Sequence, residues 1–304
     1  MYALRRNLRK AVFQEQGVPR YLIIWNVQKL EQVGRDAAVV KGLVFFEPRL
    51  VQFLLSLSAI KSQQLVVYCA RGGMRSASVV RLLQEHGFLV SQLEGGYKCF
   101  RQFVLKQLQN TVPPLIVLHG KTGVGKTLLL QKLPDYVDLE GLAQHRSSLF
   151  GAIHKSPRTQ KDFEALLVQK LKTLPSALPV FVEGESRKVG QVFIPAAFAK
   201  AMRGGTLVLL KVALETRISR IVEEYQICDE QSIQQMRLWL KHGEIENIVH
   251  MLLVDYYDPR YLNAMSRYKF VLELSAEDLN QAAAELIGFR NEIVNSYRKQ
   301  SISK

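Results

Sequence analysis

The sequence contains few cysteines and no long apolar run, and each shortage excludes a class of protein. Three cysteines occur among 304 residues and no CxxC pair is present, so neither a disulfide framework nor a zinc site is indicated. No stretch approaches the roughly 18 apolar residues of a membrane span, and residues 21–25 are too short for a signal peptide. We therefore expect a soluble protein of a reducing compartment, the cytoplasm.

Acidic residues are also scarce. The chain has 41 Lys and Arg against 27 Asp and Glu, a formal net charge of +14. A surplus of this size gives the surface a positive potential that attracts polyanions such as RNA, DNA or anionic lipid. Charge alone is equally compatible with a basic protein that binds none of them.

Buried-strand and helix patterns alternate along the chain. Helices are expected over residues 43–60, 76–86, 97–109 and 127–132. Strands are expected over residues 65–68, 88–93, 115–119, 179–183, 206–211 and 269–272. The alternation predicts an α/β fold with a parallel sheet. The sequence Thr-Val-Pro-Pro at 111–114 is typical of a linker, so we expect one domain over residues 1–110 and another over 115–304.

A P-loop motif begins at Gly120. The sequence Gly-Lys-Thr-Gly-Val-Gly-Lys-Thr fits GxxxxGK[ST] at every fixed position and lies between an expected strand and helix. Gly120, Gly123 and Gly125 let the backbone curl so that several N–H groups face a phosphate at a helix N-terminus. Lys126 supplies a point charge, and Thr127 is a candidate ligand of Mg²⁺. The motif predicts a phosphate site, which a nucleotide and another diphosphate suit equally.

Acidic side chains follow the strand expected at 179–183. P-loop folds carry a metal-binding or water-orienting carboxylate at such a strand end. A second polar cluster occupies residues 138–146. We expect both groups to support the phosphate site, with an ordinary solvated loop as the alternative for the first. The candidates are Glu183, Glu185, Arg187, Asp138 and Arg146.

The sequence Cys-Ala-Arg-Gly-Gly-Met-Arg-Ser starts at Cys69, again between an expected strand and helix. Loop amides and a helix N-terminus stabilise negative charge, so the pKa of the thiol should fall and the thiolate become available. Arg71 and Arg75 strengthen this effect and are suited to bind an oxyanion. We expect Cys69, Arg71 and Arg75 to be catalytic, with a buried structural cysteine as the alternative.

Two reaction classes fit the cysteine loop. The Cys-x5-Arg spacing is the signature of cysteine phosphatases, whereas the loop of rhodanese-like sulfur and selenium carriers is usually one residue shorter. Tyr68 stands where phosphatases carry a His, and residues 93–97 (Leu-Glu-Gly-Gly-Tyr) look like the rhodanese strand-to-helix turn. The rhodanese-like interpretation is therefore favoured. Cys99 is a candidate to resolve an oxidised Cys69, although a packed or surface thiol is the simpler interpretation.

The pairing of this loop with a P-loop resembles the bacterial tRNA 2-selenouridine synthases. The similarity spans roughly residues 36–260, and its most specific part is residues 137–146. The other matching stretches are 69–76, 93–98, 123–127, 182–187 and 255–259. The resemblance implies an N-terminal rhodanese-like α/β domain followed by a P-loop NTPase-like parallel α/β domain with C-terminal helices.

The same resemblance implies an enzyme that modifies wobble 2-thiouridine in certain tRNAs. A geranyl group from geranyl diphosphate is first attached to the sulfur, and selenium from selenophosphate then replaces the geranylthio group. Cys69 would serve the selenium step, and the P-loop would hold the prenyl diphosphate or a nucleotide, with Mg²⁺ on Thr127. The implied partners are tRNA and a supplier of selenophosphate. A cysteine phosphatase fused to a P-loop NTPase and an inactive RNA-binding regulator are the alternatives.

The N-terminus departs from the family pattern. A rhodanese-like domain normally opens with a strand that carries Asp-Val-Arg, whereas residues 21–27 read Tyr-Leu-Ile-Ile-Trp-Asn-Val. The resemblance begins near residue 34. We therefore expect residues 1–35 to be divergent or mis-started, and the rhodanese-like domain to be incomplete at its N-terminal edge.

Overall fold

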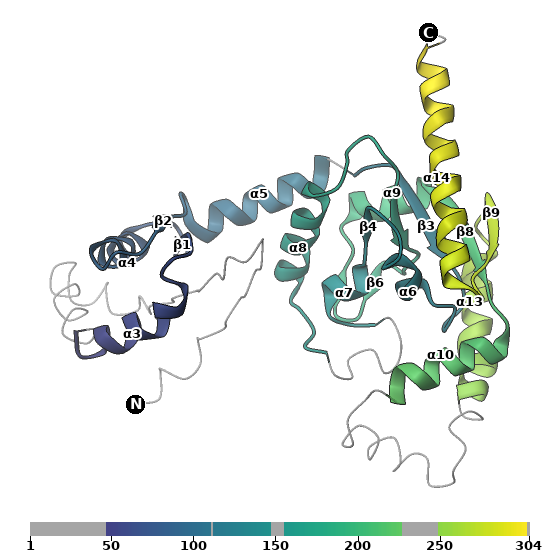
Figure 1. Cartoon of the computed structure of the whole chain (residues 1–304), viewed down its shortest axis with the longest axis horizontal. Coiled ribbons are helices and arrows are strands. Elements are labelled where there is room, and N and C mark those ends of the chain that lie inside the picture. The colour runs from purple at the N-terminus through teal and green to yellow at the C-terminus, as the bar shows by residue number, and fades with distance from the viewer. Residues whose placement is uncertain (1–46, 111, 147–154, 227–248, 303–304) are drawn as a thin grey trace, which may run out of the picture. The chain divides into compact units, whose positions relative to one another are not determined.

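The computed structural model of the chain describes residues 47–110, 112–146, 155–226 and 249–302 (Figure 1). The chain divides into two compact units between Val104 and Leu105. This division lies within helix α5 (Gly96–Asn110), a few residues before the Pro-containing stretch at 111–114. No helix in the described ranges is long and apolar enough to cross a membrane.

The described part of the first unit contains a two-stranded parallel sheet, in which Leu65 pairs with Val90 and Val67 pairs with Gln92. A small core of Leu57, Leu83 and Phe88 packs under these strands. The elements are the 3₁₀ turns Glu47–Arg49 and Ser58–Ile60, α3 (Leu50–Leu57), β1 (Leu65–Val67), α4 (Met74–Glu85) and β2 (Val90–Gln92), followed by α5.

The sequence-based expectations for this unit are confirmed in type, but the strands are shorter than expected. The helix expected over 43–60 is present from Glu47 onward, and residues 43–46 and 21–27 lie outside the described ranges. Two paired strands do not establish a rhodanese-like domain, which stays a prediction.

The second unit is built on a five-stranded parallel sheet with the order β4-β5-β3-β8-β9 (Figure 1). This confirms the predicted α/β fold with a parallel sheet. The central strand is buried along its whole length, which explains its uninterrupted apolar sequence. The strands are β3 (Leu115–His119), β4 (Tyr136–Val137), β5 (Val180–Glu183), β8 (Thr206–Lys211) and β9 (Leu272–Ser275).

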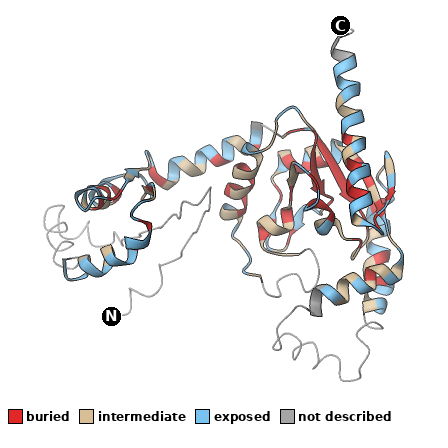
Figure 2. Cartoon of the chain, in the orientation of Figure 1, coloured by how far each residue is buried: buried red, intermediate tan, exposed pale blue. Residues whose placement is uncertain are grey.

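Helices and one short antiparallel hairpin, β6 (Lys188–Val189) with β7 (Val192–Phe193), surround this sheet. The 24-residue helix α14 packs with its first half on the sheet and is largely exposed in its second half (Figure 2). The helices are α6 (Lys126–Leu130), α7 (Leu139–Ala143), α8 (Gln160–Lys172), α9 (Ala196–Gly204), α10 (Leu214–Gln226), α13 (Asp258–Met265) and α14 (Leu279–Ile302), with a π-helix at Leu252–Tyr257.

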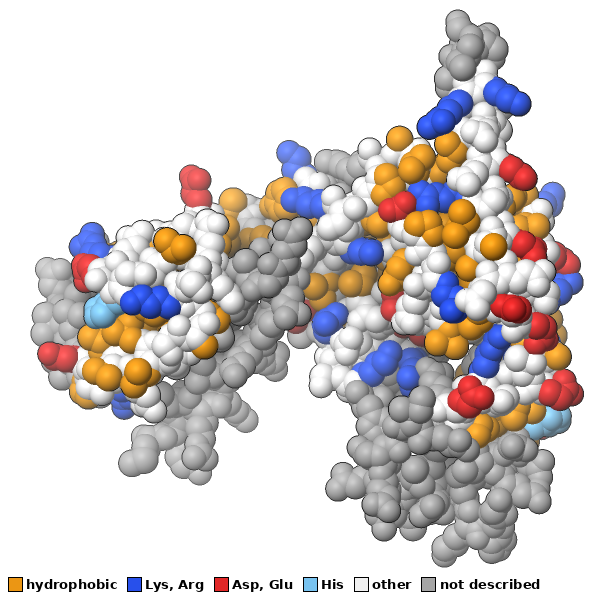
Figure 3. All heavy atoms as spheres, viewed as in Figure 1, with side chains coloured by type: hydrophobic (Ala, Val, Ile, Leu, Met, Phe, Trp, Pro, Cys, Tyr) orange, Lys and Arg blue, Asp and Glu red, His pale blue; other side chains and the backbone are white. Residues whose placement is uncertain are grey.

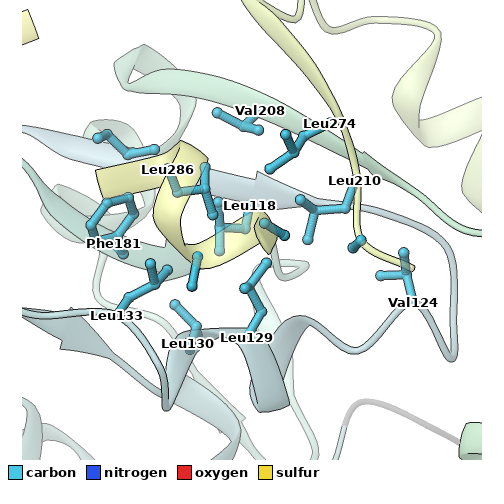
Figure 4. Packing of buried hydrophobic residues seen from close by; sticks show 14 residues of the cluster. Leu118, Val124, Leu129, Leu130, Leu133, Phe181, Val208, Leu210, Leu274 and Leu286 are labelled. Carbon is cyan, nitrogen blue, oxygen red and sulfur yellow. The ribbon is translucent and has the colours of Figure 1, made fainter. Parts of the chain in front are cut away.

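The main core lies between the sheet, α6 and α14. The side chains of Leu118, Leu129 and Leu286 point into it from these three elements and are fully buried (Figure 4). Replacing such a leucine by alanine typically costs about 2–5 kcal/mol of unfolding free energy. The core therefore fixes α6, and with it the end of the P-loop, against the sheet.

One strand prediction is misplaced. The last strand was expected over 269–272, whereas β9 begins at Leu272. Tyr268 and Phe270 instead pack their rings on His119, with centroids 4.8 and 5.6 Å away. These two aromatic residues belong to a cluster around His119 and not to the strand, although their composition is typical of one.

Candidate functional site

The cysteine loop connects β1 to α4 and carries Cys69 at its start. Cys69 is buried, with 7% of the residue exposed. Its sulfur accepts hydrogen bonds from the N–H of Gly73 (3.2 Å) and from the hydroxyl of Ser76 (3.3 Å). Gly73 is the N-cap of α4, so the sulfur lies at the positive end of that helix.

These hydrogen bonds lower the pKa of the Cys69 thiol to about 7. Burial by itself raises this pKa, but the Ser76 hydroxyl and the backbone N–H groups of Arg71, Ser76 and Gly73 outweigh burial because they stabilise the thiolate. A larger fraction of the Cys69 thiol than of an ordinary cysteine is therefore ionised at neutral pH. The loop presents a nucleophile that needs no separate base.

Arg71 and Arg75 lie on the loop and on the first turn of α4. Arg71 is exposed, and Arg75 is half-buried. It is the backbone N–H of Arg71 that contributes to the lowered thiol pKa. The binding of an oxyanion by the two guanidinium groups stays a prediction.

Two glycines let the cysteine loop lie directly against the turn before α5. Gly72 and Gly96 both have positive φ, +66° and +61°. A Cβ on Gly96 would lie 2.2 Å from the nitrogen of Gly72 and 2.3 Å from the carbonyl oxygen of Cys69. The N–H of Tyr97 donates to that same oxygen (2.9 Å). The Leu-Glu-Gly-Gly-Tyr segment therefore forms one wall of the cysteine loop.

The P-loop connects β3 to α6 in the second unit. Gly123 and Gly125 have φ values of +82° and +86°, a conformation that glycine adopts without steric cost. A Cβ on Gly120 would lie 2.8 Å from the Val124 side chain, so the loop closes tightly on this glycine. The Lys126 ammonium donates to the carbonyl oxygen of Gly120 (3.0 Å). The motif residues thus build a compact, internally bonded loop.

The Lys126 ammonium also lies 5.5 Å from the ring centre of Tyr261 on α13. Burial lowers the pKa of this ammonium, but Tyr261 and the carboxylates of Glu185, Glu140 and Glu183 raise it more, so the net shift is upward. Lys126 therefore stays charged, as a phosphate-binding lysine must.

Four carboxylates meet at the C-terminal end of β5. Glu183 is fully buried, and its carboxylate accepts hydrogen bonds from Thr127 Oγ1 (3.4 Å) and from the N–H of Glu140 (2.8 Å). Burial raises the pKa of Glu183 well above its ordinary range, and the charges of Glu140, Glu185 and Asp138 raise it further. The structure therefore places Glu183 beside Thr127 and puts Glu185 and Asp138 close enough to affect the pKa of Glu183, while the Asp138 side chain accepts from the N–H of Gly141.

Oxygen atoms at this point suit a magnesium ion that arrives with a phosphate. Mg²⁺ is usually bound by one or two protein oxygens together with phosphate oxygens and water. The Thr127 hydroxyl and the Glu183 carboxyl group, 3.4 Å apart, supply two oxygens of this kind, and their binding of Mg²⁺ stays a prediction. Within the described ranges, no group of three or more His, Cys, Asp or Glu side chains is arranged to hold a metal. A phosphate would therefore have to complete the coordination.

A buried ion pair holds the outer side of the P-loop. Arg217 of α10 makes two hydrogen bonds to the carboxylate of Asp258 on α13 (2.6 and 2.9 Å), and Lys121 of the loop makes a third (2.9 Å). Burial raises the pKa of Asp258, but the hydrogen bonds and charges of Arg217 and Lys121 outweigh it and lower the pKa. Asp258 is therefore an ionised anchor for the loop.

Two arginines of α10 also bind backbone carbonyl groups of the loop. Arg217 Nε donates to the carbonyl oxygen of Thr122 (2.8 Å), and Arg220 donates to that of Val124 (2.8 Å). On α13, the Tyr261 hydroxyl accepts from the N–H of Gly120 (3.3 Å). Two carbonyl groups of the loop are thus tied to α10.

His119 ends β3 immediately before the P-loop. Burial and the charge of Lys126 lower the pKa of its ring to about 4, so the ring is neutral at physiological pH. The ring is packed against Tyr268 and Phe270 and also fills the space in front of Gly184, where a Cβ would lie 2.5 Å from it. His119 therefore acts as an aromatic core residue.

Two other predicted residues lie in less informative places. Arg187 is exposed between β5 and β6, where its carbonyl oxygen accepts from the N–H of Ile194 (3.0 Å). Arg146 is half-buried at the end of a described range, and its carbonyl oxygen contacts the ring of His145. The contribution of both guanidinium groups to a phosphate site stays a prediction.

Sequence analysis did not identify most of the residues that contact the P-loop but lie outside its motif. Arg217 and Arg220 lie three apart on an amphipathic helix, which places them on one face, but such spacing is common. Asp258 lies in the matching stretch 255–259, which was the one available signal. No local pattern indicates Tyr261 or His119.

Comparison with known proteins relates the second unit to one family. Residues 113–240 match the family model described as the tRNA 2-selenouridine synthase AAA domain. The tRNA 2-selenouridine synthase of Shewanella piezotolerans is 42% identical over 163 residues, which cover 52% of this chain and 45% of that protein. That of Pseudomonas syringae pv. syringae is 42% identical over 165 residues, with coverages of 53% and 45%. That of Shewanella loihica is 37% identical over 201 residues, with coverages of 63% and 54%.

These matches confirm the predicted similarity to tRNA 2-selenouridine synthases, and the family model locates it in the second unit. The chain spans about half the length of the curated relatives it matches. A solved gluconokinase from Sinorhizobium meliloti 1021 covers 63% of this chain and 99% of its own at 16% identity. Its TM-score is 0.33, which is too slight a likeness to bear on function.

Proposed function

We propose that this chain is a tRNA-modifying transferase that converts wobble 2-thiouridine to 2-selenouridine through S-geranyl-2-thiouridine. The observation that carries the proposal is the presence, in one chain, of a match to the tRNA 2-selenouridine synthase AAA domain and a buried cysteine whose pKa is about 7. Geranyl diphosphate and selenophosphate are the proposed co-substrates. A protein that produces selenophosphate is the proposed supplier.

The P-loop is assigned to the prenyl donor. In the proposed first step, the sulfur of 2-thiouridine attacks the geranyl carbon, the carbon–oxygen bond breaks, and diphosphate leaves. Lys126 lies where it can neutralise the charge that develops on the departing diphosphate. A magnesium ion held by Thr127 and Glu183 would add Lewis-acid assistance. A nucleotide is the alternative ligand of the same loop.

The Cys69 loop is assigned to the selenium step. Alkylation turns the sulfur of the base into a better leaving group. The selenium of selenophosphate then attacks the base carbon, the carbon–sulfur bond breaks, geranylthiolate leaves, and water cleaves the selenium–phosphorus bond to release phosphate. Selenophosphate is an anion, so the guanidinium groups of Arg71 and Arg75 and the loop amides suit its binding. The Cys69 loop, with a thiol whose pKa is lowered, is the proposed receiver of selenophosphate.

The proposed macromolecular substrate is tRNA. The formal net charge of +14 favours a polyanion, because neutralising phosphates releases counterions. On the face drawn in Figure 3, Lys and Arg side chains are scattered among Asp and Glu, with no single basic stripe. The charge therefore supports general attraction of tRNA and does not single out a path for it.

The test is mass spectrometry of nucleosides from 2-thiouridine-containing tRNA incubated with the protein, geranyl diphosphate and selenophosphate. We expect selenouridine from the wild type. Cys69→Ser should accumulate the S-geranyl nucleoside, because only the selenium step is lost. Lys126→Ala should leave 2-thiouridine unchanged. Cys99→Ser, which removes an exposed thiol, is the matched control and should behave as the wild type.

Three results would contradict the proposal. Loss of both steps in Cys69→Ser would overturn the division of labour between the two loops. Hydrolysis of an aryl phosphate that depends on Cys69 and Arg75, without any change in the nucleosides, would instead support a cysteine phosphatase with the Cys-x5-Arg signature. Binding of tRNA with neither activity would support an RNA-binding regulator.

A further inference from the structure

Gln92, the last residue of β2, reaches into the cysteine loop. Its side-chain Nε2 donates to the carbonyl oxygen of Gly72 (2.5 Å) and to the hydroxyl oxygen of Ser76 (2.8 Å), with a longer contact to the carbonyl oxygen of Gly73 (3.3 Å). Ser76 is buried, with 2% of the residue exposed, and donates to the sulfur of Cys69 (3.3 Å). A chain of hydrogen bonds therefore runs from Gln92 through Ser76 to the thiol.

The direction of this chain follows from the donors and acceptors present. A backbone carbonyl only accepts, so the oxygens of Gly72 and Gly73 fix the NH₂ end of the Gln92 amide toward the loop. That NH₂ group then donates to Ser76, whose oxygen acts as an acceptor. The single hydroxyl proton of Ser76 must be donated elsewhere.

Two acceptors are within reach of the Ser76 proton, the carbonyl oxygen of Gly73 (3.1 Å) and the Cys69 sulfur (3.3 Å). A negatively charged acceptor binds a hydroxyl proton more strongly than a neutral one does. The proton therefore turns to the sulfur once the thiolate forms. Gln92 holds the Ser76 oxygen where its proton can reach either the Gly73 carbonyl oxygen or the Cys69 sulfur.

We propose that Gln92 is a positioning residue, which promotes ionisation of Cys69 by aiming the Ser76 hydroxyl at the sulfur. The proposal rests on the proposed function only in taking Cys69 as the reacting thiol. Neither tRNA nor selenophosphate enters its test, so the two proposals fail separately.

Charged side chains near the loop are not an alternative explanation for the ionisation of Cys69. Burial raises the pKa of Cys69, and hydrogen bonds from Ser76, Arg71 and Gly73 outweigh it; among the described residues, no charged side chain is one of the causes of the net lowering. The described elements around the sulfur carry further charged or titratable groups: Tyr68 and Arg71 beside Cys69, Arg75, Arg81 and Glu85 of α4, Glu94 of the following turn, and Tyr97, Lys98, Cys99, Arg101 and Lys106 of α5.

The experiment is alkylation of the full-length protein by iodoacetamide between about pH 5 and about pH 10, with peptide mass spectrometry reporting Cys69 separately from the other thiols. The wild-type rate should rise with a midpoint near pH 7. Gln92→Met keeps the length of the side chain but removes the donor. Its midpoint should rise by about one pH unit, which lowers the rate at pH 7 about fivefold.

A double-variant cycle distinguishes two roles for Gln92, positioning the Ser76 hydroxyl and merely holding the loop closed. Ser76→Ala should raise the midpoint at least as far as Gln92→Met, and the double variant should match Ser76→Ala, because Gln92 then has no hydroxyl to aim. Gln84→Met is the matched control. Gln84 is exposed on the neighbouring α4, and its side chain donates to the carbonyl oxygen of Val90 (3.1 Å), away from the sulfur, so its loss should leave the midpoint unchanged.

Three outcomes would overturn the proposal. The first is a wild-type midpoint in Gln92→Met. The second is a further shift when Gln92→Met is added to Ser76→Ala. The third is found at high pH, where all of the thiol is ionised. If the alkylation rate of Gln92→Met there rises to that of a free thiol, Gln92 merely holds the loop closed.

Discussion

Arg217→Met is expected to destabilise the second unit strongly, because it leaves Asp258 as a buried carboxylate with one partner fewer. The side chain of Arg217 is 3% exposed and that of Asp258 12%. Removing one member of a buried pair typically costs about 3–5 kcal/mol. Lys121 still bonds Asp258 and is 35% exposed, so water reaches its side of the carboxylate. We therefore expect the lower end of this range, about 3 kcal/mol.

Thermal unfolding followed by scanning calorimetry at neutral pH is the assay. In a unit of about 200 residues, each kcal/mol lowers the Tm by about 2–4 °C, so a fall of about 6–12 °C is expected. Lys211→Met is the matched control, because it breaks an ion pair with Glu273 whose side chains are 61% and 55% exposed. Its expected cost is below about 1 kcal/mol.

The pH dependence of the difference gives a second check. The Arg217 contacts lower the pKa of Asp258, so their contribution to stability is present above the unfolded pKa and is lost as pH falls through the folded one. The difference in unfolding free energy between wild type and Arg217→Met should therefore become smaller as the pH falls. A Tm that falls no further than in the Lys211 control, or a gap that does not depend on pH, would refute this account of the ion pair.

Three further predictions concern single side chains. Gly96→Ala should lower the unfolding free energy of the first unit by about 1–3 kcal/mol or more, because a Cβ there would lie 2.2 Å from a backbone atom and φ is +61°. It should also abolish alkylation of Cys69 at neutral pH. Gly73→Ala, whose Cβ would have nothing within 4 Å, should lower the unfolding free energy much less, as measured by denaturant unfolding. His119→Phe should flatten the loss of stability in acid. The folded pKa of this histidine is about 4 against an ordinary 6.5, so the unfolded state takes up the proton first as pH falls between these values; equal acid sensitivity in urea melts of wild type and variant would contradict the assignment. Lys126→Ala should abolish binding of inorganic pyrophosphate in titration calorimetry, whereas Lys132→Ala, which removes an exposed hydrogen bond to Asn280, should not. Unchanged pyrophosphate affinity in Lys126→Ala would argue against the loop as the phosphate site.

Three of the five strands in the main sheet of the second unit, β3, β5 and β8, were predictable from sequence, whereas β4 was missed and β9 was misplaced. The bounds of β3 and β8 coincide with the expected segments, because a central parallel strand is apolar on both faces and its ends are marked here by proline, glycine or a charged residue. Residues 269–271 were wrongly included in the expected strand 269–272, because Phe270, an aromatic residue of the kind common in strands, packs on His119 instead. Composition does not separate the two cases.

The candidate sites were predictable only where they are local in sequence. The glycines and lysine of the P-loop are contiguous, so a motif contains them. Arg217, by contrast, bonds a carbonyl group 95 residues away in sequence, Arg220 one that is 96 away, and Tyr261 a residue that is 141 away. Their positions depend on how α10 and α13 pack, which no short-range pattern records. Gln92 was missed for the same reason at a shorter separation of 16 residues from Ser76.

The bonds from α10 to the loop carbonyls have a consequence for ligand affinity. Because Arg217 and Arg220 fix the carbonyl groups of Thr122 and Val124, the loop takes its shape when the unit folds. A site that is preorganised in this way loses little conformational entropy when its ligand binds. Substitutions on α10 should then weaken diphosphate binding through the entropy of a loosened loop, although no residue of α10 carries the phosphate motif. Affinity at the P-loop is in this sense a property of the folded unit.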